Sequence, residues 1–160
     1  MTNFRKGTVI LCAVMVGLFF AVGCKKDDPK GPIEYPIDIP FTEYLLAETC
    51  EWTSFESNNV IVINSDDELN DYIVCTDDNY SKIDFSKHSL LLVRGAAGSN
   101  IINIDVDFSQ NTECEYVLEV LIHVGMATVA PPWLISMITT KVGNDANVSL
   151  NVQEIQKIVD

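Results

Sequence analysis

Hydrophobic and polar positions alternate along much of the second half of the chain, with the period of two that is typical of half-buried β-strands. In residues 102–108, Ile, Ile, Val and Phe alternate with Asn, Asp and Asp. In residues 116–124, apolar side chains at every second position lie opposite Glu119 and His123. Both segments are therefore predicted strands with one face toward a core and one face toward water.

Other segments have the length and composition of strands without a strict alternation. Val60–Ile63 and Leu90–Val93 are short, uninterrupted apolar runs, which are typical of buried strands. A turn is expected at Gly143-Asn144-Asp145, because these residue types favour chain reversal. Further strands are predicted at Phe41–Cys50, Trp133–Thr140 and Val148–Val152.

One helix is predicted from its start signal. Ser65-Asp-Asp-Glu68 forms a capping box, in which the Ser65 hydroxyl accepts from the Glu68 amide while the Glu68 side chain reaches back. Leu69, Tyr72 and Ile73 follow at the spacing of one helical face. A second, shorter turn is expected around Ile155. The predicted fold class is α+β and mainly β, an antiparallel sheet or sandwich of about seven strands with one short capped helix.

The N-terminal segment has a different composition. Arg5 and Lys6 precede an uncharged stretch, Gly7–Gly23, of 17 residues. A basic start, an apolar centre and small residues at the end predict a secretory signal in residues 1–23. The alternative is a retained transmembrane helix, for which this stretch is only just long enough.

The residues at the end of this stretch favour the signal. Ala21-Val22-Gly23-Cys24 resembles the lipobox of bacterial lipoproteins, which implies cleavage between Gly23 and Cys24 and acylation of Cys24. Lys26-Asp27-Asp28 looks like the export signal of Bacteroidota surface lipoproteins. The resemblance implies an outer-membrane location facing the cell exterior, with membrane lipid as a partner through the acyl chains of Cys24.

Charge and composition then bound the mature protein. The whole chain has a formal charge of −13, and loss of Arg5 and Lys6 leaves 8 basic against 23 acidic side chains, or −15. Without a basic surplus, nucleic-acid binding is excluded. Residues 24–40 contain four prolines among charged residues and predict an extended tether. Residues 41–160 are predicted to form a single globular domain.

Cys50, Cys75 and Cys114 remain after the signal and the lipidated cysteine, and they allow three pairings. An oxidising compartment makes a disulfide plausible. We favour Cys50 with Cys75, since one ends the first predicted strand, the other ends the predicted capped helix, and both border elements that are expected to pack together. Closing this loop stabilises the fold by roughly 3 kcal/mol in the chain-entropy model.

Catalytic patterns are scarce, and no catalytic residue, metal or cofactor is predicted. The two histidines, His88 and His123, belong to no metal-binding motif, and a solvated His123 is favoured over an acid–base role. Asp105 and Asp107 share a strand face, and a second acidic cluster is Asp77-Asp78-Asn79; solvated carboxylates are favoured over a calcium site at both. Gly95–Ser99 is interpreted as a hairpin connection, since it lacks the spacing of a nucleophile elbow.

Two tryptophans can serve recognition or packing. Trp133 follows two prolines at the start of an apolar strand, which favours core packing. Trp52 lies between Glu51 and Thr53 and is the better candidate for an exposed, glycan-binding aromatic.

Residues 60–150 resemble small uncharacterised Bacteroidota lipoproteins and, more distantly, the C-terminal domain of the protease-complex subunit family PrcB. The resemblance rests on a strand, a capped helix and a turn into a buried strand, here carried by Ser65, Glu68, Leu69, Ile83, Asp84, Phe85 and Ser86. It implies a non-catalytic accessory subunit and transfers no catalytic residue.

The expected function is therefore that of a surface-anchored, non-catalytic binding or accessory domain for other envelope proteins. The alternative is glycan binding in polysaccharide capture. An unpaired sheet edge or an apolar patch would favour a protein partner, whereas an aromatic platform at Trp52 would favour glycans.

Overall fold

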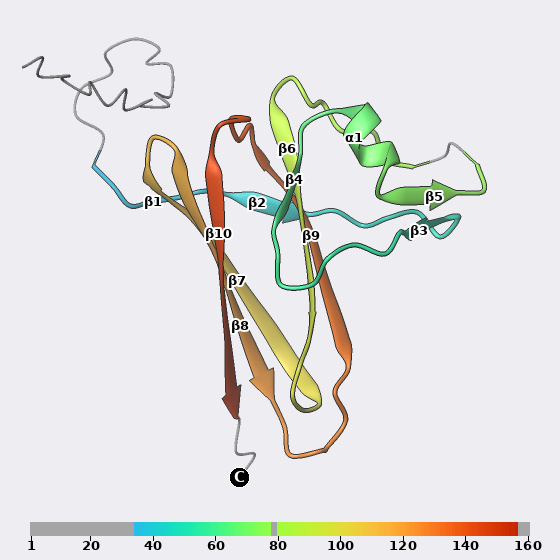
Figure 1. Ribbon diagram of the computed structural model, residues 1–160, viewed down its shortest axis with the longest axis vertical. Helices are drawn as coiled ribbons and strands as arrows, with labels where there is room; N and C mark the ends of the chain where they lie inside the picture. The colour runs from blue at the N-terminus through green and yellow to red at the C-terminus, as the bar shows by residue number, and fades with distance from the viewer. Residues whose placement is uncertain (1–33, 78–79, 157–160) are drawn as a thin grey trace, which may run out of the picture.

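Ten strands and one helix make up the part of the chain that the computed structural model describes, residues 34–77 and 80–156 (Figure 1). The mainly β, α+β class is confirmed, and the strands beyond the seven expected are short. The elements are β1 (Ile37–Asp38), β2 (Phe41–Glu43), β3 (Cys50–Trp52), β4 (Ile61–Ile63), α1 (Asp66–Asn70), β5 (Ile73–Cys75), β6 (His88–Ala96), β7 (Ile101–Thr112), β8 (Glu115–Val124), β9 (Pro132–Thr140) and β10 (Asn147–Gln156).

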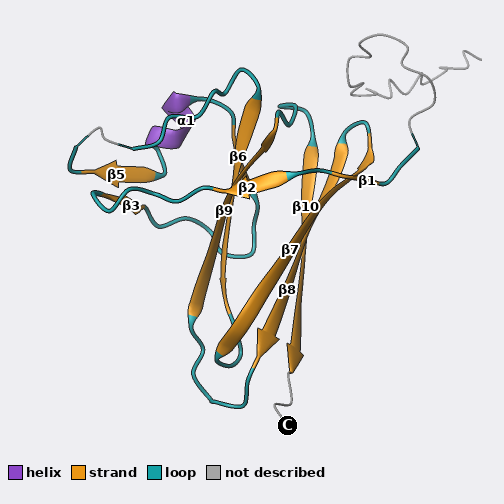
Figure 2. Ribbon diagram, turned by 180° about the vertical axis from the view of Figure 1, so that it is seen from behind, coloured by secondary structure: helices purple, strands orange, loops and turns teal. Residues whose placement is uncertain are grey.

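Two four-stranded sheets face each other. Sheet A has the strand order β1-β7-β8-β10, and sheet B has the order β2-β9-β6-β4. A separate two-stranded ribbon, β3-β5, lies with α1 on the far side of sheet B (Figure 2). We call the described residues 45–60, 64–77 and 80–83 the arm.

The alternation of apolar and polar residues correctly predicts which face of β8, an inner strand of sheet A, is buried. Leu118, Val120 and Ile122 of β8 are at most 1 % exposed, and β8 is paired on both sides, with β7 and with β10. The expectation for Ile102 is wrong. The β7–β8 register shifts between Ile101 and Asn103, so this irregularity leaves Ile102 exposed instead of facing the core.

The long strands are divided between the two sheets, with β6 and β9 in sheet B and β7, β8 and β10 in sheet A. β6 and β7 belong to different sheets, so Gly95–Ser99 is a crossover and the predicted hairpin is wrong. β9 likewise crosses back to β10 through the predicted turn, in which the Ala146 N–H donates to the Gly143 carbonyl oxygen. β10 runs parallel to β8 over its whole length, in contrast to the other strand pairs, and it includes Ile155, where a short turn was expected.

An extended segment, Ile37–Glu43, bridges the two sheets, and we call it the strap. Its β1 half pairs with β7 and its β2 half pairs with β9 (Figure 1). The paired residues begin four positions before the expected domain boundary at Phe41. The single strand predicted over Phe41–Cys50 is instead divided between β2 and β3, which pair with different partners.

The main core lies between the sheets. Sheet B contributes Leu91, Val93 and Met137, and sheet A contributes Phe108 and the inner face of β8. Trp133 is 5 % exposed in this core, so the prediction of core packing is confirmed. Gly95 lies directly opposite Trp133, and a Cβ at Gly95 would overlap the indole ring. Glycine is therefore required where the ring crosses β6.

A second core lies between sheet B and the arm. It contains Leu90 and Leu92 of β6, Ile63 of β4 and Leu69 of α1, each at most 1 % exposed. The run Leu90–Val93 is thus buried on both faces of sheet B, which explains its lack of polar residues.

The capping prediction for α1 is confirmed in part. The Ser65 hydroxyl accepts from the Glu68 N–H at 3.2 Å, and the Glu68 carboxylate accepts from the N–H of Asn64. The helix ends at Asn70, earlier than predicted, and Ile73 already belongs to β5.

The predicted disulfide between Cys50 and Cys75 is present. The two residues are direct cross-strand neighbours in the β3–β5 ribbon, with their Cα atoms 4.0 Å apart. The bond closes the arm at its far end from sheet B.

Candidate functional site: an open groove between the sheets

The strap covers only the upper part of the gap between β7 and β9. β1 pairs with β7 at Ser109 and Gln110, and β2 pairs with β9 at residues 137–139. Within the described residues, the remainder of each strand has no ladder partner on this side. Two unpaired strand edges therefore border one gap.

The hydrogen bonds of the strap show which backbone groups face this gap. The Ile39 N–H donates to the Phe108 carbonyl oxygen at 2.8 Å. Because successive residues of an antiparallel strand direct their N–H and C=O groups to opposite sides, those of Val106 and Ile104 face the same open edge. The Tyr44 N–H donates to the Ser136 carbonyl oxygen at 2.9 Å, which by the same alternation places the backbone groups of Leu134 on the open edge of β9.

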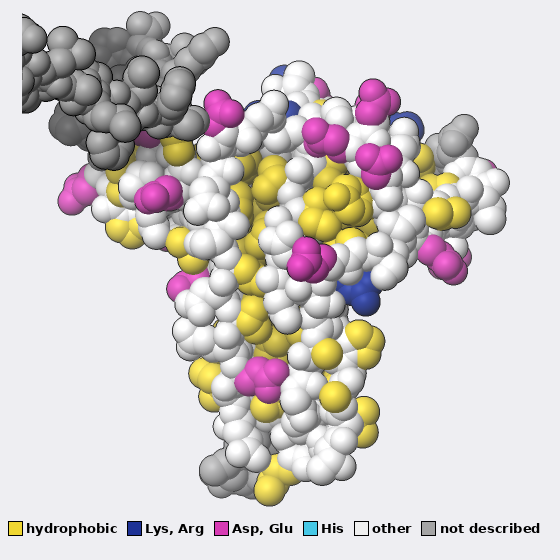
Figure 3. Space-filling view, in the orientation of Figure 1, with side chains coloured by type: hydrophobic (Ala, Val, Ile, Leu, Met, Phe, Trp, Pro, Cys, Tyr) yellow, Lys and Arg dark blue, Asp and Glu magenta, His cyan; other side chains and the backbone are white. Residues whose placement is uncertain are grey.

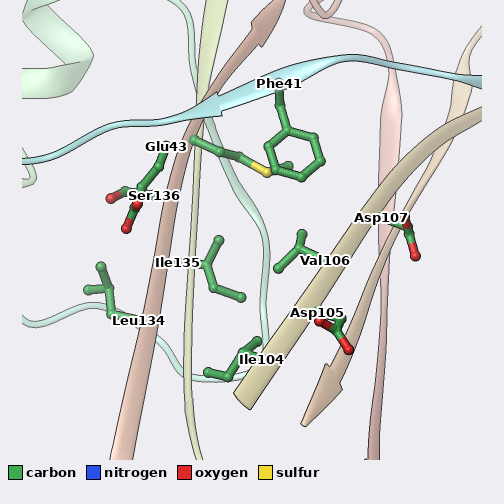
Figure 4. Close-up of a pocket in the computed structure, with 10 residues that line it drawn as sticks. Phe41, Glu43, Ile104, Asp105, Val106, Asp107, Leu134, Ile135 and Ser136 are labelled. Atoms are coloured by element: carbon green, nitrogen blue, oxygen red, sulfur yellow. The ribbon is translucent and has the colours of Figure 1, made fainter.

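The gap contains a groove of about 590 Å³ with an apolar floor. This volume lies within the range typical of ligand-binding clefts. Figure 4 shows Ile104 and Val106 from β7 and Ile135 from β9 pointing toward one another, with Phe41 of the strap above them. In the space-filling view, the apolar side chains form a strip between the two layers (Figure 3).

The rim of the groove is acidic. Asp105 and Asp107 project from β7 away from the floor, and Glu43 lies on the opposite side beside Ser136 (Figure 4). No Lys or Arg is among the residues that line the groove. The site therefore combines apolar side chains, unpaired backbone groups and negative charge.

His123 lies next to this rim and has a partner that the sequence did not predict. Its Nε2 is 2.8 Å from Oδ2 of Asp105, and the Asn103 side-chain amide donates to the other Asp105 oxygen at 2.7 Å. The His123 side chain is 24 % exposed, compared with 53 % for Asp105. These contacts fix the orientation of Asp105 at the edge of β7.

The other candidate residues lie away from the groove. Trp52 is half-buried in the second core, with its ring centroid 6.1 Å from that of Tyr44, so it is not the exposed aromatic that we expected. Burial, with a smaller effect from Tyr80, raises the pKa of Tyr44, whose hydroxyl donates to the Ser81 carbonyl oxygen. Within residues 34–77 and 80–156, no cluster of three or more His, Cys, Asp or Glu has the arrangement of a metal site.

The predicted lipidation and export residues Gly23, Cys24, Lys26, Asp27 and Asp28 lie outside the described residues. Among the described residues, no helix has the length and apolar character needed to span a membrane.

Comparison of the chain with protein-family models, curated proteins and solved structures finds no match. The resemblance to the PrcB family and to small Bacteroidota lipoproteins therefore stays an expectation from the sequence.

The groove was not predicted from the sequence. Its floor residues were correctly assigned to strands, but a pattern of alternation does not show which strands lie at an edge. The one available signal was the strap, where Ile37 and Ile39, in the segment that we interpreted as a tether, alternate with Asp38 and Pro40 and lead into Phe41.

Proposed function

We propose that this protein is a lipid-anchored, surface-exposed envelope lipoprotein whose domain binds an extended segment of another envelope protein without catalysing a reaction. The anchor part of the proposal rests on the lipobox residues around Cys24 and on Lys26-Asp27-Asp28. The binding part rests on one observation, the apolar groove bordered by the open edges of β7 and β9.

An open strand edge beside an apolar groove favours strand addition by a peptide segment. The N–H and C=O groups of Ile104 and Val106 supply backbone hydrogen bonds, and the groove accepts alternate side chains of the added strand. An unpaired edge otherwise exposes a protein to uncontrolled pairing. A partner that covers the edge removes this exposure.

The strap is an internal example of the same binding mode. Its residues Ile37–Asp38 add to the edge of β7 in antiparallel register, and Ile39 and Phe41 pack against the main core. A partner segment would continue along β7 below the point where the strap leaves it.

We do not extend the proposal to glycans. That alternative depended on an exposed aromatic at Trp52, and the Trp52 ring, at the end of β3 in the arm, packs against Tyr44 in the second core.

Photo-cross-linking on intact cells tests the proposal. A benzoyl-phenylalanine placed at Leu134, on the rim and 40 % exposed, should give a discrete cross-linked protein species. The matched control is the same substitution at Val74 on the arm, which is 65 % exposed and should give none. Cys24→Ser should abolish labelling with radioactive palmitate and the cross-linked species together, since blocked lipidation and processing would keep the protein from the cell surface.

A second variant tests strand addition itself. Val106→Pro removes one N–H from the open edge and keeps the β7–β8 ladder, because that N–H does not face β8. It should reduce the Leu134 cross-link by roughly threefold to tenfold, the effect of losing one hydrogen bond. Cross-linking of equal strength at Leu134 and Val74, or none at Leu134, would refute the groove as a binding site.

A further inference from the structure

We infer that the segment bound in the groove alternates basic and apolar residues, with an apolar residue opposite Val106 and a basic residue on each side of it. This inference rests on the proposed function and deepens it, because it names the chemistry of the partner. It follows from the charge of the rim and from the register of β7.

The rim carries negative charge that the described residues leave largely uncompensated. Asp105 has His123 as its partner, whereas Asp107 and Glu43 take part in no ion pair within residues 34–77 and 80–156. The lining contributes no Lys or Arg to balance them. A partner that brings positive charge to this rim is therefore favoured over a neutral or acidic one.

The register of β7 decides where that positive charge must lie. The backbone of Val106 faces the open edge while its side chain faces the floor, and Asp105 and Asp107 project from the other face (Figure 4). A residue paired with Val106 places its own side chain over the floor. Its two neighbours then lie beside Asp105 and Asp107, whose positions are about 7 Å apart along the strand.

A second copy of this chain does not meet these requirements through its own β7. Its edge would bring Asp105 and Asp107 against the same residues of its partner, and like charges directly opposite one another destabilise strand pairing. The observations therefore favour a different protein, with a short segment of the pattern basic–apolar–basic.

The test uses full-length protein in detergent micelles and three fluorescent nine-residue peptides, measured by fluorescence anisotropy. All three carry valine at the same alternate positions, with lysine, serine or glutamate between them. The lysine peptide should bind roughly 3- to 30-fold more tightly than the serine peptide, as expected for two cross-strand charge pairs. The glutamate peptide should bind more weakly than the serine peptide.

Asp105→Asn/Asp107→Asn should remove the preference for lysine, so that this variant binds the lysine and serine peptides with equal affinity. The control, Glu51→Gln/Glu56→Gln, removes the same charge from exposed positions on the arm and should keep the preference. If the three peptides bind with equal affinity and Val106→Pro weakens their binding, this inference is overturned and the proposed function is retained. A lysine preference that the control variant also loses would overturn the inference as well. Absence of binding by every peptide would overturn both proposals.

Discussion

The two faces of sheet B are covered in different ways. Its inner face packs against sheet A, whose strands β7, β8 and β10 are 12, 10 and 10 residues long. Its outer face packs against the arm, whose helix and strands are only 3–5 residues long. Both covers bury leucines completely, but the first is held by long backbone ladders and the second by short elements closed with a disulfide.

The difference shows that equal burial does not imply equal structural support. A side chain between two long ladders has neighbours that cannot relax without breaking many hydrogen bonds. A side chain under a five-residue helix has neighbours that can shift into a cavity. The groove lies on the better supported side, where the edges of β7 and β9 belong to the two long sheets.

Truncation of one fully buried leucine on each side of sheet B should give the largest losses in the free energy of unfolding. Leu118 and Leu69 are both 0 % exposed. We expect Leu118→Ala to lower the free energy of unfolding by about 4 kcal/mol and Leu69→Ala by about 2 kcal/mol, since the cost of a cavity depends on how far the site can collapse. Urea denaturation followed by circular dichroism measures both values. A loss at Leu69 as large as that at Leu118 would contradict the proposed difference in support.

Removal of the disulfide should have an intermediate effect that is concentrated in the arm. Cys50→Ala/Cys75→Ala opens a loop with a sequence separation of 25 residues, and we expect a loss of about 3 kcal/mol. Native-state hydrogen exchange should quicken in β3 and β5 while the amides of β8 stay protected. If β8 loses protection to the same extent, the arm and the sandwich form one cooperative unit and the comparison fails.

The smallest effect on the free energy of unfolding is expected at the turn that leads from the arm into β6. A hydrogen bond from the Ser86 hydroxyl, followed by the contact with Lys87 at 3.0 Å, lowers the pKa of Asp84 to about 2 from 3.8. Because the folded pKa is depressed, the stabilisation is present above about pH 4 and is lost as the pH falls through about 2. A carboxyl carbon titration by NMR should place the Asp84 midpoint near 2.

Ser86→Ala should move this midpoint upward, because it removes the largest contribution, and the fold of sheet A should be unaffected. A midpoint near 4 in the unmodified protein would show that the turn does not hold the Asp84 carboxylate as described.

The elements that were predicted correctly are those that local patterns determine. The alternation of β8, the apolar run in β6, the Ser65 cap and the core position of Trp133 all follow from residue type and spacing. The Cys50–Cys75 pairing also followed from the order of the elements, since both residues border segments that pack together.

The features that were missed depend on where each strand finds its partner. Gly95–Ser99 has the composition of a turn, but composition does not show that the chain crosses to another sheet. The alternation in β10 is equally compatible with parallel or antiparallel pairing. Asp105 was interpreted as a solvated carboxylate, because only the β7–β8 register brings it to His123. The groove forms only when the strands are divided between the two sheets in this way, so its position follows from the strand pairings and not from any single segment.

The order of the strands along the chain has a consequence for folding. The β7–β8 hairpin joins neighbouring residues, whereas β10 pairs with β8 across 32 positions, as between Glu115 and Asn147. The strap reaches β7 across 73 positions, from Ile37 to Gln110. Local contacts form before distant ones, because closing a longer loop costs more entropy. We therefore expect the hairpin to form before the strap docks, so that the groove acquires its upper boundary only after most of sheet A has formed.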